Sequence, residues 1–200
     1  MGIKLDYPAG ATPLGPEDAR ALVPGHITTQ GQLNEWEFLN VREGEEWAFG
    51  RRHREILSIG FLQTLHQRMF GNTWRWAGDI RTKETHPVGA PPESIRAELE
   101  RLFKDVAVQL KDGTWPIGEI AARFHHRLVS IHPFPNGNGR FSRTMTDLLL
   151  DRESRERFSW GADLDREGEA RTRYIASLRA ADAKDYGALF ALLGLPENEK

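Results

Sequence analysis

A helical stripe that stops at a proline is the feature that most constrains this sequence. Apolar residues recur at intervals of three or four from Ile117 to Ile131, which predicts an amphipathic helix. Pro133 follows two residues later, and proline cannot continue a helix because it lacks a backbone N–H and its ring clashes with the preceding turn. A second helical stripe opens at Phe141. The chain therefore places two helices at the two ends of one short loop.

Similar spacing predicts further helices, while only one segment favours strands. The helices are expected at about 33–47, 55–70, 94–110, 167–180 and 185–193, with Ser94 as the N-cap of the third. The glycine- and proline-rich segment 71–92 predicts a loop with a small hairpin at about 79–88. The fold class is therefore all-α, a helical bundle with a small β-hairpin.

The domain organisation follows from the same pattern. The first 26 residues contain four prolines and four glycines, which predicts an arm laid over the surface. We expect residues 1–54 to form this arm and a helix that packs on the core, and residues 55–200 to form the main domain.

Composition excludes several classes of function. With 27 Lys+Arg against 29 Asp+Glu the net charge is −2, which argues against direct nucleic-acid binding. The absence of cysteine excludes disulfides, thiolate metal sites and cysteine nucleophiles. No apolar signal segment and no apolar run long enough for a membrane span occur in the sequence, so we expect a cytoplasmic protein with no membrane contact.

The loop HPFPNGNGR, which runs from His132 to Arg140, carries the densest chemistry in the chain. No Asp or Glu occurs between Ile120 and Thr146, so the loop lies in a basic stretch. Glycines before a helix N-terminus allow backbone N–H groups and the helix dipole to bind an anion. Arg140 and Arg143 reach one helix face, and His132 is a natural general base. This pattern favours a phosphoryl or nucleotidyl transfer site over a simple helix–helix connector.

The same residues resemble the Fic (filamentation induced by cAMP) signature, H-x-F-x-[D/E]-[G/A]-N-[G/K]-R-x-x-R. HPFPNGNGRFSR agrees with it at every fixed position except the acidic one. The stretches FHHRLVSI, GNTWRWAGDIR and RYIASLRAAD are also similar to the family, so the likeness covers about residues 61–193. NEWE, EEWAFGRR and GNTWRWAG resemble, more narrowly, the branch called mobile mystery protein B.

The resemblance implies a Fic-type helical bundle with a hairpin flap that aligns the target. It implies transfer of AMP from ATP, with Mg²⁺, to a Ser, Thr or Tyr hydroxyl of a target protein, with release of pyrophosphate. Proteins of the narrower branch tend to be encoded beside a helix-turn-helix partner on mobile elements, so a partner of that kind or an antitoxin-like one is expected. An isologous homodimer is a further expectation for such a scaffold.

Roles follow from the resemblance by position. His132 would deprotonate the attacking hydroxyl, and Phe134 would be buried and fix the loop against the core. Phosphate oxygens would be bound by the backbone amides of the glycine-rich part, by the asparagine side chain and by two guanidinium groups. These phosphate-binding positions are Gly137, Asn138, Gly139, Arg140 and Arg143.

One departure from the signature concerns the metal. The acidic position that ligates Mg²⁺ in the family is Asn136 here, and an amide carbonyl can ligate Mg²⁺ but adds no charge. Asn136 has four possible interpretations: weaker metal binding, a different reaction, a nearby carboxylate that replaces the acidic ligand, or an ordinary turn residue.

A second departure concerns autoinhibition. Many Fic proteins carry a helix with [S/T]-x-x-x-E-[G/N], whose glutamate pairs with the second arginine of the signature. No full match occurs here, and Thr29–Asn34 has Leu33 at the glutamate position. Glu35 is the candidate inhibitory residue, with Glu37 on the same helix as the other. A solvated helix face and restraint by a partner protein are the alternatives.

Two other functions fit the same scaffold. With the nucleotide bound in reverse, the protein would transfer phosphate instead of AMP, and Asn136 leaves room for this reaction because it alters metal ligation. The third hypothesis is a catalytically silent module that binds a nucleotide and a partner. Retention of His132 argues against silence, because a binding module needs no base.

Overall fold

The computed structural model describes residues 16–50, 53, 55–84, 89–161, 164 and 168–196. Within these ranges the chain is helical and contains no strand, and one isolated antiparallel bridge joins Leu22 to Trp74. The elements in chain order are α1 (Pro16–Ala19), α2 (Gln30–Phe49), α3 (Ile59–Phe70), the 3₁₀ turn η1 (Pro92–Ser94), α4 (Ile95–Asp112), α5 (Ile117–Ile131), α6 (Asn138–Arg152), α7 (Glu169–Asp182) and α8 (Gly187–Leu192).

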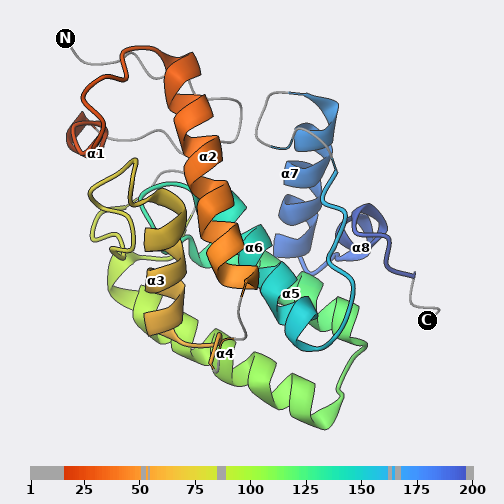
Figure 1. The fold of residues 1–200 in the computed structure, drawn as a ribbon. Helices are drawn as coiled ribbons and strands as arrows, with labels where there is room; N and C mark the ends of the chain where they lie inside the picture. The colour runs from red at the N-terminus through yellow and green to blue at the C-terminus, as the bar shows by residue number, and fades with distance from the viewer. Residues whose placement is uncertain are drawn as a thin grey trace.

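The helices form one bundle around α5 and α6 (Figure 1). Helix α2 packs along α3 and also reaches α6, and α4 packs against α5 and α3. Helices α7 and α8 pack on each other, and α8 contacts α5. The all-α prediction is confirmed. The hairpin predicted at 79–88 falls partly outside the described residues, and the described residues 79–84 form no strand.

Local capping explains where the helices begin. At α2 the Thr29 hydroxyl accepts from the Gln32 N–H, and the Gln32 side chain accepts from the Thr29 N–H, which satisfies two N–H groups of the helix end. At α3 the Ser58 hydroxyl accepts from the Phe61 N–H, so this helix begins later than the predicted residue 55. Ser94 lies at the predicted N-cap position of α4, but its hydroxyl donates to the Pro91 carbonyl instead of accepting from an N–H of the helix.

The core lies where α3, α5 and α6 meet. Phe70, Phe124, Phe134 and Phe141 are fully buried there, which makes Phe134, in the loop between α5 and α6, part of the packing. Burying one such ring contributes about 1.5–3 kcal/mol to the free energy of unfolding. A smaller apolar cluster joins α7 and α8 to Ala122 of α5.

Part of the predicted N-terminal arm lies on the loop after α3. The Val23 N–H donates to the Thr73 carbonyl at 2.8 Å, and the Arg75 N–H donates to the Ala21 carbonyl at 2.9 Å. Residues 1–15 of that arm lie outside the described residues. Among the helices described, none combines the length and the apolar character that crossing a membrane requires.

Candidate active site

The loop 132–137 joins α5 to α6 through two residues with left-handed backbones. His132 ends α5 at φ 53° and ψ 62°, and Gly137 precedes α6 at φ 77°. A Cβ atom at Gly137 would lie 2.6 Å from Cζ of Phe70, so only glycine fits this close approach. The loop therefore turns sharply enough to place the end of α5 beside the start of α6.

A buried histidine from α3 supports the loop from below. The His66 ring stacks on the Phe134 ring with centroids 3.6 Å apart. Its Nδ1 accepts from the Gly78 N–H at 3.0 Å, so Nε2 carries the proton and donates to the Asn136 carbonyl at 3.1 Å. Burial lowers the pKa of His66 to about 3, and the ring is therefore neutral at physiological pH.

The Asn138 side chain holds the loop through two hydrogen bonds. Its Oδ1 accepts from the Phe134 N–H at 3.0 Å, and its Nδ2 donates to the Phe134 carbonyl at 2.8 Å. Both polar atoms of this side chain bind the Phe134 backbone in this structure, and its contact with phosphate stays a prediction. Asn138 and Gly139 still begin α6, where the first N–H groups of a helix have no acceptor within it.

His132 lies buried at the other end of the loop, only 9% exposed. Burial, and after it the positive charge of Arg81, lower the pKa of its imidazole to about 4, although a hydrogen bond to the Val129 backbone partly opposes both effects. The imidazole is consequently neutral near pH 7 and able to accept a proton.

Arg140 lies on the first turn of α6 and contacts the acidic face of α2. Its Nη2 donates to Oε2 of Glu37 at 2.9 Å, and its guanidinium lies over the Phe70 ring. Oε1 of Glu37 also accepts from the Trp74 indole N–H at 2.6 Å. Glu35 is exposed on the same helix, so the structure brings the second of the two candidate glutamates to the signature arginine.

A small pocket of about 170 Å³ opens between α2 and α6 beside Arg140 and Arg143. The other residues that line it are Phe38, Val41, Arg42, Glu45, Thr144, Asp147 and Trp160. Burial raises the pKa of Asp147 to about 6, although the Trp160 N–H donates to both of its carboxylate oxygens. The pocket thus combines three arginines with two carboxyl groups, and that of Asp147 is partly protonated near neutrality.

The residues of the loop do not fit a magnesium site built by the protein. Oδ1 of Asn136 accepts from the Gly137 N–H at 2.6 Å, so this amide oxygen serves as a turn acceptor. Among the described residues, no group of three or more His, Asp or Glu side chains is arranged to hold a metal ion.

The comparisons with known proteins agree with this geometry. The sequence model of the Fic/DOC family matches residues 56–150. A probable protein adenylyltransferase of Sinorhizobium fredii, y4lH, is 31% identical over 146 residues, which cover 63% of this chain and 72% of that protein. The chain belongs to the Fic/DOC family.

Other Fic proteins show how far the similarity extends. Protein adenylyltransferase fic-1 of Caenorhabditis elegans is 35% identical over 139 residues, which cover 68% of this chain but only 26% of that longer protein. The crystal structure of BepC with bound AMPPNP, from Bartonella tribocorum, aligns with a TM-score of 0.67 at 18% identity and covers 90% of this chain and 96% of that one. This structural match confirms the Fic-type fold predicted from the sequence.

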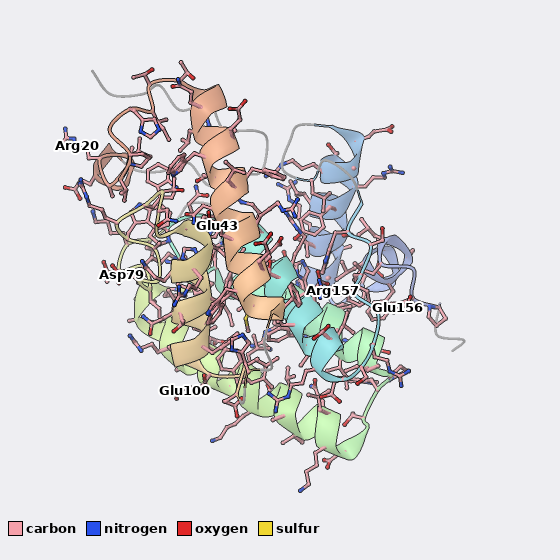
Figure 2. All side chains as sticks on the ribbon, in the orientation of Figure 1. Arg20, Glu43, Asp79, Glu100, Glu156 and Arg157 are labelled. Carbon is pink, nitrogen blue, oxygen red and sulfur yellow. The ribbon has the colours of Figure 1, made fainter. Side chains whose placement is uncertain are left out.

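Two supporting residues of this Fic site were missed by the sequence analysis. His66 belongs to none of the motifs quoted there, and Arg81 is only the last letter of GNTWRWAGDIR. Figure 2, in which Asp79 marks the segment leading to Arg81, shows this segment beside α3. The only sequence signal for these two residues was that they lie within the stretch similar to the family, about residues 61–193. That similarity did not indicate which groups His66 and Arg81 contact.

Proposed function

We propose that this Fic-family protein transfers AMP from Mg·ATP to a Ser, Thr or Tyr hydroxyl of a target protein and releases pyrophosphate. The observation that carries the proposal is the neutral, buried His132 at one end of a loop whose other end is the N-terminus of α6. Relatives named protein adenylyltransferases and the AMPPNP bound in BepC support ATP as the substrate.

In this mechanism His132 accepts the proton of the target hydroxyl, and the oxygen attacks the α-phosphorus of ATP. The bond from the α-phosphorus to the bridging oxygen breaks, and pyrophosphate leaves with its electron pair. The backbone N–H groups of Asn138 and Gly139, at the positive end of α6, donate to phosphate oxygens. Arg140 neutralises the β- and γ-phosphates, and Arg143 binds the γ-phosphate in bidentate fashion.

We also propose Glu37 as the inhibitory residue of this site, in place of Glu35. Its carboxylate binds Arg140 at 2.9 Å and so occupies a guanidinium that the phosphates need. The family pattern uses the second signature arginine for this contact, whereas here the first one makes it. Release of α2, by ATP or by a partner protein, would free Arg140 for the nucleotide.

The partners follow from the mechanism and from the branch resemblance. The substrate partner is a protein with an accessible hydroxyl, presented to His132 beside the segment after Arg81, where the family has its flap. We further propose a helix-turn-helix or antitoxin-like partner that is encoded beside this protein on a mobile element. The protein is also proposed to form a homodimer and to act in the cytoplasm.

Phosphotransfer is the second candidate, and Asn136 is the observation that favours it. Without a carboxylate at this position, Mg²⁺ is held by phosphates alone, and the orientation of ATP depends on the arginines. If the nucleotide bound in reverse, the γ-phosphorus would face the hydroxyl that His132 activates.

The deciding experiment follows label from ATP into proteins of a bacterial lysate. Purified wild-type protein and its Glu37→Gln variant receive Mg·ATP labelled at the α- or the γ-phosphate. His132→Ala is the inactive control, and His26→Ala, which changes an exposed histidine, is the matched control. Label from the α-position alone, absent with His132→Ala, supports AMP transfer. Label from the γ-position alone supports phosphotransfer. If neither wild type nor Glu37→Gln transfers label from either position, both enzymatic proposals are contradicted and a silent binding module is favoured.

A further inference from the structure

Arg81 is a buried arginine whose hydrogen bonds converge on the loop that carries His132. The side chain is 4% exposed, and each described hydrogen bond of its guanidinium ends on a backbone carbonyl. Nε donates to the carbonyl of His132 at 2.6 Å, and Nη2 donates to the carbonyls of Ala90 and Ile131. Nη1 donates to the Lys83 carbonyl at 3.0 Å.

Backbone hydrogen bonds attach both ends of the segment 81–90 to the same loop. The Arg81 N–H donates to the Pro133 carbonyl at 2.9 Å, and the Ala90 N–H donates to the Ile131 carbonyl at 3.2 Å. The guanidinium therefore lies between the two ends of the segment and the three consecutive residues 131–133. The Arg81 side chain thus joins the backbone at Lys83, at Ala90 and at residues 131–132.

The contact with His132 has a specific consequence for the reaction. A non-glycine residue at φ 53° costs about 1–2 kcal/mol relative to a right-handed backbone, so surrounding contacts must hold it. The short, charge-assisted hydrogen bond from Arg81 fixes the direction of the His132 carbonyl, and thereby the direction in which the imidazole leaves the chain.

We infer that Arg81 is a positioning residue of the transfer reaction, which holds His132 in its left-handed conformation and fixes both ends of the segment 81–90 to the catalytic loop. The inference rests on the proposed function for its kinetic part only. Arginine suits this task because its rigid fork carries five N–H donors, whereas a lysine ammonium is a single compact charge that cannot serve these carbonyls together.

The alternative is that Arg81 only stabilises the fold, as other buried polar residues do. Asn40 offers a matched control, because it is 3% exposed and its side chain binds Asn72, Thr73 and the Arg68 carbonyl away from the loop. Asn40→Ala should lower the melting temperature without altering the turnover of the molecules that remain folded.

The test compares wild type, Arg81→Lys, Arg81→Met and Asn40→Ala in the full chain. Hydrogen exchange measured by mass spectrometry reports on residues 128–134 and 89–91. NMR of ¹³C-labelled histidine follows the titration of the His132 imidazole. Label transfer from α-labelled ATP into lysate proteins is normalised to the number of molecules that bind the ATP analogue AMPPNP.

If the inference is right, both Arg81 variants exchange faster in the two segments together, and Asn40→Ala does not. Turnover per binding-competent molecule falls about 100-fold, the loss expected when a catalytic group is misplaced by about 1 Å, while KM for ATP changes less than about threefold. The Lys variant retains the charge yet fails to restore turnover. The His132 pKa rises in Arg81→Met, because a positive charge is removed from its surroundings.

Unchanged exchange in both segments, or turnover per competent molecule as in wild type, would overturn the inference. Should Arg81→Met be too unstable to purify, Arg81→Lys provides the same comparison. If the wild-type protein transfers no label at all, the proposed function fails on its own, and hydrogen exchange and the histidine titration still decide whether Arg81 holds the loop.

Discussion

Glu37 on α2 and Arg140 on α6 lie 103 residues apart in the sequence, and their side chains meet at 2.9 Å. The same carboxylate accepts from the Trp74 indole, so it is held by two donors in a half-buried position. This contact links the helix outside the family match to the first signature arginine. In the proposed mechanism, helix α2 therefore competes with the phosphates of ATP for Arg140.

Replacing Glu37 with glutamine should activate the protein. The amide of the new side chain retains an oxygen for the Trp74 N–H but lacks the charge that binds Arg140. A hydrogen bond between charged groups contributes about 1.5–3 kcal/mol, so the apparent KM for ATP should fall by about tenfold or more. Label transfer from α-labelled ATP at low ATP concentration measures the change. Glu35→Gln, on the exposed face of α2, is the control, and an equal response of both variants would contradict the assignment.

Replacing Arg143 with alanine should weaken the binding of ATP and slow its turnover. Arg143 lines the pocket beside Arg140, where the γ-phosphate is proposed to lie. Loss of a charge-assisted contact to phosphate should raise KM for ATP by about ten- to a hundredfold. Arg42→Ala, which removes an arginine from the α2 side of the same pocket, serves as the comparison. A KM equal to that of wild type would remove Arg143 from the phosphate site.

Replacing Gly137 with alanine should destabilise the loop. The new methyl group would meet Phe70 at 2.6 Å, and the residue would have to keep a φ of 77°. The left-handed backbone and the overpacking together should cost about 2–4 kcal/mol of unfolding free energy. Urea unfolding measures this loss. Gly60→Ala, where a Cβ meets nothing within 4 Å, should leave the stability nearly unchanged or slightly raised.

Replacing Asn136 with aspartate should lower the Mg²⁺ concentration needed for transfer. The new carboxylate can still accept from the Gly137 N–H, so the turn is retained while a charged metal ligand is added. The measurement is the rate of label transfer against Mg²⁺ concentration at fixed ATP. Asn136→Ala lacks both the turn acceptor and the ligand, and it should transfer less label at every Mg²⁺ concentration. If the curves of rate against Mg²⁺ concentration were the same for wild type and Asn136→Asp, position 136 would not contact the metal.

Stability should fall as the pH falls below about 6.5, because three histidines are buried in their neutral form. Their pKa values are lowered to about 3 for His66 and His125 and to about 4 for His132, mainly by burial. In the unfolded chain each histidine has its ordinary pKa of 6.5. As the pH falls below 6.5, the unfolded state therefore binds more protons than the folded state. Stability present above pH 6.5 is therefore lost on acidification.

Asp147 acts in the opposite direction, since its pKa is raised to about 6 in the folded protein. One carboxyl group opposing three histidines leaves a net loss of stability toward acid. Thermal unfolding at pH 7.5, 6 and 5 measures the trend, and Asp147→Asn should make it steeper. Equal melting temperatures at pH 7.5 and pH 5 would contradict the neutral state of the buried histidines.

Local chemistry explains how much of the protein could be predicted from its sequence. Apolar spacing predicted the positions of α2 to α8, because a helix that buries one face must repeat its apolar residues every three or four positions. The proline break and the paired glycines predicted the loop 132–140, since their backbone preferences do not depend on distant residues. The predicted start of α3 was wrong, because Ser58 caps the helix, which begins four residues further on, at Ile59. Ser94 was correctly placed at the start of α4, but its hydroxyl binds the Pro91 carbonyl, a choice that depends on local geometry.

The sequence by itself determined the helical bundle, the loop between α5 and α6, and the type of each chemical group on that loop. Only the tertiary structure decided what these groups bind: the Asn138 side chain holds Phe134, His66 supports Asn136, Arg81 binds His132, and Glu37 binds Arg140. The physical reason is the difference in range. Backbone preferences and apolar periodicity act over a few residues, whereas the last three contacts join groups 51 to 103 positions apart that meet only when the helices pack.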